Sequence, residues 1–552
     1  MDQRRIILFM VFAFSLLMLW EGWNKHNNPA PAAEAVAAAQ STADGSVPTP
    51  SARLAPGQSA VPGAAASASA SAAPVMVVET DLLRAEVSAQ GGDIVRLELK
   101  QHKASDDPGS NFVLFDDGRS GHQYAAQTGL IGDGLPTHKT LFALPANTME
   151  LAAGEQKLEV RLPAQAENGV EVTKVLRFER GSYLIDVGYE IRNGSGQAIS
   201  PHAYFQFVRD GEPADQVGGF GVRTFTGPAF YTEEGKFQKV EFKSVSAGDA
   251  KFVKTASDGW VAMVQHYFVG AWLPEQGQQR EYFARVVGQD LFAAGAIEPL
   301  TAIGDGAQAE IFSRLYAGPQ EQDKLEDIAP GLQLVVDYGW LTVIASPLFW
   351  VLSWFHRLTG NWGWAIILVT IALKALFFPL SAASYKSMAK MRVLGPRLQR
   401  MKELYGNDKP KMQQEMMNLY RTEKINPLGG CLPILVQIPV FIALYWVLLG
   451  SVEMRHTPWL GWIQDLSARD PYFILPIIMG ASMMIQMKLN PTPPDPIQAK
   501  VMMAMPIIFT FMFLWFPSGL VLYWVVNNVL SIAQQWQITR MIESGKGNAK
   551  AS

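Results

Sequence analysis

Two hydrophobic patterns divide this chain. Across residues 75–333, apolar and polar residues alternate in short runs that Gly, Asn, Asp and Pro separate. A period of two with turn residues between the runs is typical of antiparallel strands that are buried on one face. After residue 335 the alternation gives way to long apolar runs, as in helices that cross a bilayer. The pattern therefore predicts a large antiparallel β-sandwich followed by an α-helical membrane part.

The β part is predicted to occupy residues 75–335. No internal repeat period is apparent in it, so we expect one large sandwich. The clearest strand predictions are the runs 75–78, 94–99, 158–162, 172–178, 183–191, 252–253, 260–264 and 309–316.

The N-terminal residues predict an anchor and a linker. Apolar residues 6–20 follow Arg4 and Arg5, a pattern that fits either a signal peptide or an uncleaved membrane anchor. The run is long for a signal peptide and no good cleavage site follows it, which favours an anchor over residues 1–26. Residues 27–74 are rich in Ala, Pro and Ser and nearly free of charge, so they predict a flexible linker.

The second half of the chain holds five candidate spans. Their apolar cores are residues 362–380, 428–449, 472–487, 502–516 and 520–538. With the N-terminal anchor they make six spans.

Charge asymmetry orients these spans. Residues 384–427 carry ten Lys and Arg against four acids, and basic residues accumulate on the cytoplasmic side. Arg4 and Arg5 place the N-terminus on that side as well, so the β domain is predicted to lie on the opposite, outer side of the membrane. An odd number of spans must then lie between the β domain and residue 384. The apolar run 338–356 therefore cannot be a further span.

We instead predict an interfacial amphipathic helix over residues 336–359. It would be anchored by Trp340, Trp350 and Trp354. The basic tail, residues 541–552, is then cytoplasmic like the N-terminus.

The cytoplasmic segment 384–426 predicts a helical hairpin. Its apolar residues recur at spacings of three and four, and a turn interrupts them at Gly406 and Asp408. Asp408 is a suitable N-cap for a second helix, with Pro410 in the first turn. A kink is expected at Pro396.

Composition excludes several functions. Net charge is −4, so nothing in the overall charge points to DNA. The single cysteine, Cys431, excludes an intramolecular disulfide and any CxxC site. The eight histidines show no metal-ligand spacing, and the Ser-Gly-Lys-Gly motif at 544–547 lacks the pattern of a phosphate-binding loop. No metal and no cofactor are predicted.

Lys374 is the residue with the clearest functional signal. It lies within the apolar run 362–380, about 18 Å along a helix that spans roughly 30 Å. A charge at that depth costs about 2.5–3.5 kcal/mol on insertion scales, so the lysine should face other helices or a wet cavity. Thr370 lies one turn earlier on the same face. Further polar residues within spans are Gln437, Gln486, Asn527, Asn528 and Ser531.

Other interpretations of these residues stay open. Lys374 could be structural and extend toward the interface, and the Asn and Gln side chains could simply link helices. A secondary transporter or channel that uses Lys374 as an anion site is the alternative function. A catalytic Ser–Lys dyad with Ser381 is disfavoured, because two helical turns separate the residues by about 10 Å. The protein is therefore not predicted to be an enzyme.

Three motifs resemble those of YidC-type membrane protein insertases. Residues 426–441 read Asn-Pro-Leu-Gly-Gly-Cys-Leu-Pro-Ile-Leu-Val-Gln-Ile-Pro-Val-Phe and resemble the third-helix signature of that family. Residues 516–524, Phe-Pro-Ser-Gly-Leu-Val-Leu-Tyr-Trp, resemble the segment before its last helix. Phe-Pro-Leu at 378–380 with Ser-Met-Ala-Lys-Met at 387–391 resembles its junction between second helix and cytoplasmic hairpin. The order of anchor, linker, β domain, interface helix and five spans is similar too.

The resemblance implies a function. Residues 360–540 would form a five-helix insertase core around a hydrophilic groove that is open to cytoplasm and lipid and closed outward. Its positive residue maps to Lys374, where many relatives carry arginine. The protein would be an inner-membrane insertase and chaperone that moves hydrophobic segments of nascent proteins into the membrane, alone or with the Sec translocon. The resemblance also implies contacts with ribosomes, and the basic hairpin suggests anionic lipids.

Two sets of site residues follow. The client-binding groove is expected to include Lys374, Thr370, Gln437, Trp524, Asn527 and Asn528. Contacts of the cytoplasmic hairpin are expected at Lys386, Lys390, Arg392 and Arg397.

Overall fold

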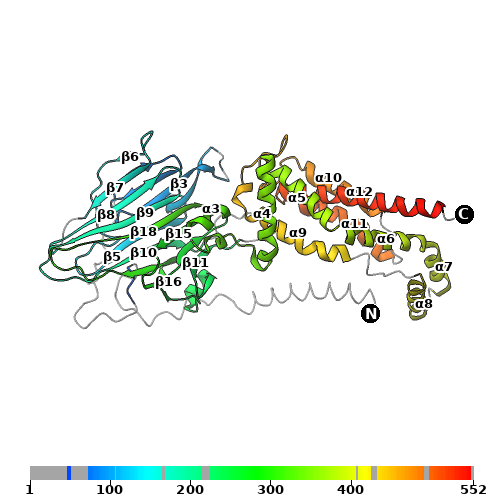
Figure 1. The fold of residues 1–552 in the computed structure, drawn as a ribbon, viewed down its shortest axis with the longest axis horizontal. Coiled ribbons are helices and arrows are strands. Elements are labelled where there is room, and N and C mark those ends of the chain that lie inside the picture. Colours follow the sequence, from blue (N-terminus) through cyan, green and yellow to red (C-terminus); the bar gives the residue numbers. More distant parts are fainter. Residues whose placement is uncertain are drawn as a thin grey trace. The chain divides into compact units, whose positions relative to one another are not determined.

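A computed structural model gives the fold of the chain (Figure 1). It describes residues 47–50, 73–105, 107, 109–164, 168–212, 224–405, 408–423, 432–489 and 496–548. The predicted anchor, almost all of the predicted linker and the end of the tail lie outside the described residues.

Two sheets form the β part, which agrees with the predicted sandwich. The ten-stranded sheet has the order β13 (Thr255–Ala256), β16 (Arg280–Gly288), β17 (Leu291–Pro299), β10 (His202–Asp210), β5 (Gln123–Ile131), β4 (Asn111–Asp117), β3 (Ile94–Lys103), β2 (Leu83–Ser88), β1 (Val75–Glu79) and β6 (Thr148–Glu150). The eight-stranded sheet has the order β12 (Lys236–Lys239), β11 (Gly227–Thr232), β14 (Trp260–Val264), β15 (Phe268–Pro274), β18 (Gln308–Pro319), β9 (Leu184–Asn193), β8 (Val170–Glu179) and β7 (Lys157–Pro163). The pairings are antiparallel except that β6 runs parallel to β1. Short helices α2 (Phe242–Ala247) and α3 (Gln322–Ile328) complete this part.

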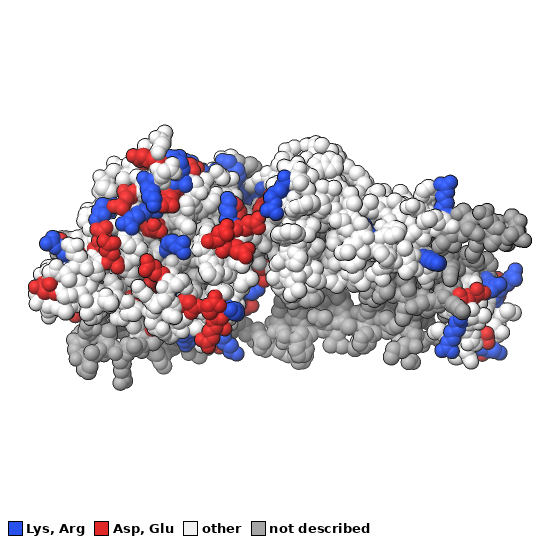
Figure 2. Space-filling view, viewed as in Figure 1, with Lys and Arg blue, Asp and Glu red and all other residues white. Residues whose placement is uncertain are grey.

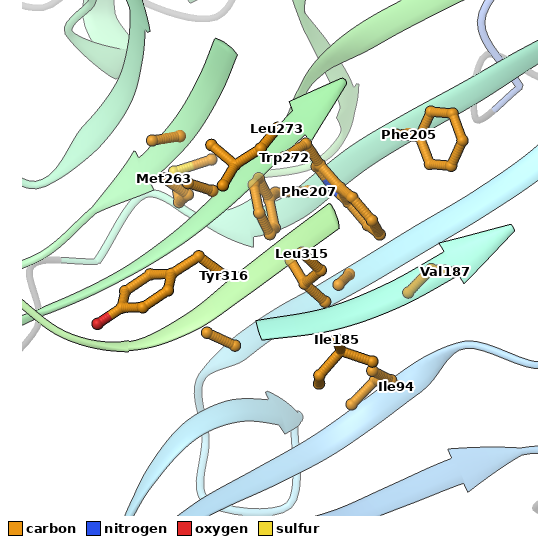
Figure 3. Packing of buried hydrophobic residues seen from close by; sticks show 14 of the residues in the cluster. Ile94, Ile185, Val187, Phe205, Phe207, Met263, Trp272, Leu273, Leu315 and Tyr316 are labelled. Carbon is orange, nitrogen blue, oxygen red and sulfur yellow. The ribbon is translucent and has the colours of Figure 1, made fainter. Parts of the chain in front are cut away.

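Large apolar side chains fill the space between the sheets (Figure 3). Phe205 and Phe207 of β10 meet Trp272 of β15, with ring centroids 5.3 and 5.8 Å apart. Leu315 of β18 and Ile185 of β9 are completely buried beside them. Burying side chains of this size stabilises a fold by about 1.5–3 kcal/mol each, so this layer is the main source of stability in the β part.

Seven of the eight predicted strand runs lie in observed strands, and one is wrong. Phe252 and Val253 form no strand. Phe252 instead stacks on Phe230 of β11 with a centroid distance of 4.2 Å, and the Val253 amide donates to the side chain of Gln238. These two apolar residues are therefore explained by packing of a loop on the sheet.

A buried ion pair crosses the sandwich. Lys174 of β8 is 1% exposed, and its Nζ lies 2.8 Å from Asp93 Oδ1. The same Nζ donates to the carbonyl oxygen of Gly91 at 2.8 Å, and Asp93 Oδ1 also accepts from the Thr128 amide. Burial lowers the pKa of Lys174, while the carboxylate opposes that shift. Each charge therefore depends on the other to remain buried.

Glu298 of β17 is expected to make the stability of the β part depend on pH. It is 1% exposed, and burial raises its pKa to about 7, while Arg280 opposes the shift. The unfolded chain releases this proton near pH 4.3, so between about pH 4.5 and 7 the folded state binds more protons. Stability should therefore fall as pH rises through this window, by up to about 1.4 kcal/mol per unit.

The variant Glu298→Gln is expected to remove this pH dependence and to be the more stable form at pH 8. Urea unfolding of the β part at pH 5, 6, 7 and 8 measures the effect. Glu171→Gln is the matched control, since the Glu171 side chain is 68% exposed. Parallel pH profiles for wild type and Glu298→Gln would contradict the prediction.

The remaining chain is helical. Its helices are α4 (Thr342–Thr359), α5 (Trp362–Leu376), α6 (Phe378–Val393), α7 (Gly395–Tyr405), α8 (Lys409–Thr422), α9 (Leu432–Gly450), α10 (Ile474–Leu489), α11 (Pro496–Phe513) and α12 (Ser518–Asn548). Short 3₁₀ turns lie at Leu332–Val335, Gly339–Leu341 and Val452–Met454. Charged residues are nearly absent from the visible surface over α4, α5, α9 and α11 (Figure 2).

The predicted apolar runs fall mainly on helices of this part, although residues 428–431 lie outside the described residues and 514–516 follow the end of α11. Among the described residues, no single helix is both long and apolar enough for a membrane span. The pair Trp362–Leu376 and Phe378–Ser387, bent by 63°, passes that test together. Three shorter apolar helices are Val436–Gly450, Ile474–Leu489 and Lys500–Phe513. The six predicted spans stay a prediction.

Helix α4 has two apolar faces. Leu348 and Leu352 are buried where α4 packs against α5 and α9. On the other side Val343, Trp350 and Trp354 are exposed. Such a surface suits the predicted interfacial position, because tryptophan favours the boundary between lipid and water. The side chain of Trp340 lies outside the described residues.

Helices α7 and α8 form the predicted hairpin. Asp408 caps α8 by accepting from the Lys411 amide at 3.1 Å, with Pro410 in the first turn. The break between α6 and α7 falls at Leu394, two residues before the predicted kink at Pro396. The predicted turn at Gly406 lies outside the described residues.

Candidate functional site

Helix α5 carries the central residue of the site. Asn361 caps it by accepting from the Trp364 amide at 3.2 Å. Ala365, Ile366, Val369 and Thr370 are buried, which is the spacing of one packed helix face. Lys374 lies one turn beyond Thr370 on that face, where α5 is about to end.

A cavity opens where α5 bends into α6. It is lined by residues of α5, α6, α9 and α12, together with the joining residue Phe377: Thr370, Leu373, Lys374, Phe377, Leu380, Ser381, Val436, Gln437, Val440, Tyr523 and Asn527. Its volume is about 30 Å³, and about 10–15 Å³ holds one water. The cavity therefore has room for two or three waters next to Lys374.

Two hydrogen bonds connect the walls of the cavity to α12. Lys374 Nζ donates to Ser531 Oγ at 2.7 Å, which joins α5 to α12. Gln437 Nε2 donates to Asn527 Oδ1 at 2.7 Å, which joins α9 to α12. The described residues that line the cavity include no Asp or Glu, so no carboxylate among them neutralises Lys374.

The structure brings together four of the six predicted groove residues: Lys374, Thr370, Gln437 and Asn527. Thr370 contributes less polarity than expected, because its hydroxyl donates to the Ile366 carbonyl of its own helix at 2.7 Å. The threonine therefore offers the cavity mainly its methyl group and its unused acceptor capacity.

The other two predicted groove residues do not line this cavity. Trp524 packs edge-on against Phe441 of α9 with a centroid distance of 4.5 Å. Asn528 turns toward α10, where its Nδ2 donates to Ser482 Oγ at 3.0 Å. Neighbours on a helix point about 100° apart, so Tyr523 and Asn527 take the cavity face instead.

The predicted hairpin residues are only partly described. Lys386 and Arg397 are exposed, and Arg397 Nη1 lies 2.7 Å from Glu423 Oε1. The side chains of Lys390 and Arg392 lie outside the described residues.

Tyr523, Ser381 and Ser531 belong to the site and were not predicted as groove residues. The sequence indicates Ser381 only as a disfavoured nucleophile, and Ser531 as one of several polar residues in spans that could converge on a wet cavity. A signal existed for α12, since Tyr523, Asn527 and Ser531 recur every four residues and so share one face.

The loop 451–473 closes one end of the helical part. Ser518 and Gly519 at the start of α12 donate their amides to the carbonyls of Ala468 and Leu466, at 2.7 and 2.9 Å. Leu466 is 1% exposed and packs in the apolar core beside α5. Asn361 Nδ2 donates to the Pro458 carbonyl at 3.0 Å. The N-terminal ends of α5 and α12 are thus covered, while the cavity lies at the opposite end of α5.

Fold and site together define a protein with a β-sandwich and an apolar helical part, in which a partly polar cavity holds a lysine and its described lining holds no carboxylate. Family comparisons agree with this class. The model of the YidC periplasmic domain matches residues 75–351, and that of the 60Kd inner membrane protein matches residues 354–546. The chain belongs to the YidC family and is a bacterial inner-membrane protein.

Two curated relatives support this membership over the whole length. The membrane protein insertase YidC of Aromatoleum aromaticum is 71% identical over 100% of both chains. That of Dechloromonas aromatica is 60% identical over 99% of this chain and 98% of its own. A crystal structure of an active YidC insertase with its first transmembrane domain resolved covers 84% of this chain and 94% of its own, at 20% identity and a TM-score of 0.38.

Proposed function

We propose that this protein is a membrane protein insertase and chaperone. It moves hydrophobic segments of nascent proteins from the cytoplasm into the inner membrane through a hydrophilic groove that includes the cavity at Lys374. The observation that carries the proposal is a lysine in a partly polar cavity whose described lining holds no carboxylate. The relatives that match the full length bear the name of this activity. No covalent step is involved, so the protein acts as an insertase and not as an enzyme.

The cavity acts by lowering the barrier to insertion. Each unpaired polar group of a client costs several kcal/mol in hydrocarbon. Lys374, Gln437 and Asn527 offer such groups partners, and the positive charge attracts acidic residues near the client's hydrophobic segment. The segment itself then leaves sideways into lipid, driven by burial of its apolar side chains.

The proposed topology follows from charge. Six spans place both termini and the basic hairpin 384–426 in the cytoplasm, and the β domain 75–335 in the periplasm. In this orientation the covered ends of α5 and α12 face the periplasm. That cover would keep the cavity closed outward while it is accessible from the cytoplasm.

Partners follow from the same arrangement. Nascent membrane proteins are the clients, with the Sec translocon as a second route of delivery. The exposed Lys386 and Arg397 suit contacts with anionic lipid or with the phosphates of ribosomal RNA.

Reconstitution tests the function directly. Liposomes that contain only the purified protein are expected to insert a small single-span client, as judged by protection of its translocated tail from added protease. Empty liposomes are the control. Equal protection in both would contradict the proposal, and uptake of small anions by the same liposomes without client insertion would favour the transporter.

A further inference from the structure

We propose that Ser531 of α12 is the positioning residue that holds the ammonium group of Lys374 inside the cavity. This inference rests on the proposed function, because it concerns how the groove cation meets a client. The geometric basis is the 2.7 Å hydrogen bond that Lys374 Nζ donates to Ser531 Oγ. The side chain of Ser531 is buried, since the residue is only 4% exposed.

The hydroxyl of Ser531 is arranged to accept from a cation. Its own proton goes to the Asn527 carbonyl, one turn earlier, at 2.7 Å. A serine that bonds back to its own helix has a fixed side-chain direction, and both lone pairs remain free to accept. Lys374 takes one of them, which joins α5 to α12 at this oxygen.

Because the hydrogen-bond partner of Lys374 is a neutral hydroxyl, it does not neutralise the lysine as a carboxylate would. The hydroxyl fixes the position of Lys374 but leaves its full positive charge for the client. The ammonium has three donors, so two remain for cavity water or for an acidic client group. Lysine is flexible, and without an acceptor its long side chain would extend toward the aqueous interface. Ser531 therefore keeps the charge at the depth of Gln437 and Asn527.

The test compares Ser531→Ala and Ser531→Thr in the full-length protein, reconstituted in liposomes. Two versions of one single-span client are used, with acidic or with neutral residues in the translocated tail. A hydrogen bond to a charged group contributes about 1.5–3 kcal/mol, so insertion of the acidic client by Ser531→Ala should fall about tenfold or more. The neutral client should change much less, and threonine, which keeps the hydroxyl, should restore the acidic client.

Ser482→Ala is the matched control. Its hydroxyl is also buried and links two helices, through Asn528, but it does not contact Lys374. The inference is overturned if Ser531→Ala inserts the acidic client as wild type does, if both clients fall equally, or if threonine fails to restore insertion. If wild type inserts neither client, the proposed function itself fails and this inference with it.

Discussion

Lys374→Glu is expected to abolish insertion of a client with an acidic translocated tail, whereas Lys374→Arg is expected to retain it. Reversal of the charge turns attraction into repulsion in a cavity whose described lining holds no other ionised group. Two unit charges about 4 Å apart interact by about 4 kcal/mol at an effective dielectric constant of 20. Insertion should therefore fall by at least about tenfold, which tail protection in the reconstituted system measures.

A lysine outside the cavity provides the control. Lys488 on α10 is exposed, and Lys488→Glu makes the identical charge change at a position to which no function is assigned. It should reduce insertion far less than Lys374→Glu does. Equal losses in the two variants would assign the effect to overall charge, and unchanged insertion by Lys374→Glu would leave the lysine with a structural role only.

Lys174→Met is expected to cause a large loss of stability in the β part. It leaves Asp93 buried without its cation, and breaking such a pair costs about 3–5 kcal/mol. Urea-dependent proteolysis of the β part in the full-length, detergent-solubilised protein measures the change. Because methionine is apolar and of similar length, the experiment isolates the charge more than the packing.

Two further variants make the result specific. Lys157→Met removes an exposed partner of Glu179 and should leave stability unchanged. Lys174→Met combined with Asp93→Leu removes both charges and should recover most of the loss, since a buried pair can be replaced by apolar residues at little cost. A single variant as stable as wild type would show that the pair contributes nothing.

Most of the β strands that sequence reasoning found have one solvated face, although β14 (Trp260–Val264) was found as an apolar run and is buried throughout. In β7, the burial of Val160 and Leu162 alternates with the exposure of Glu159 and Arg161, so a period of two is visible. All seven residues of β15 (Phe268–Pro274) are buried, and such a strand has no period. The strand β6 pairs in parallel with β1 through only three residues, too few for any pattern to predict.

In the helical part, too, the sequence predicted some features and could not predict others. The lengths of the apolar runs and the positions of Lys and Arg predicted the helices. The predicted N-cap at Asp408 was confirmed. The groove was predicted by polarity alone, which selects Asn528 as readily as Asn527. Only the packing of α12 shows that Asn528 bonds to α10 while Asn527 faces the cavity. The bond from Lys374 to Ser531 joins residues 157 positions apart, and no local pattern could predict it.

The most direct test of the central claim asks whether a client enters the cavity. A photoreactive amino acid would replace Val440, which lines the cavity, or Ile507 of α11, which is exposed on the helical surface. During insertion of a stalled client, the account predicts adducts between the client's hydrophobic segment and position 440, at a yield well above that from position 507. Equal yields from both positions, or adducts from 507 alone, would contradict entry through the Lys374 cavity.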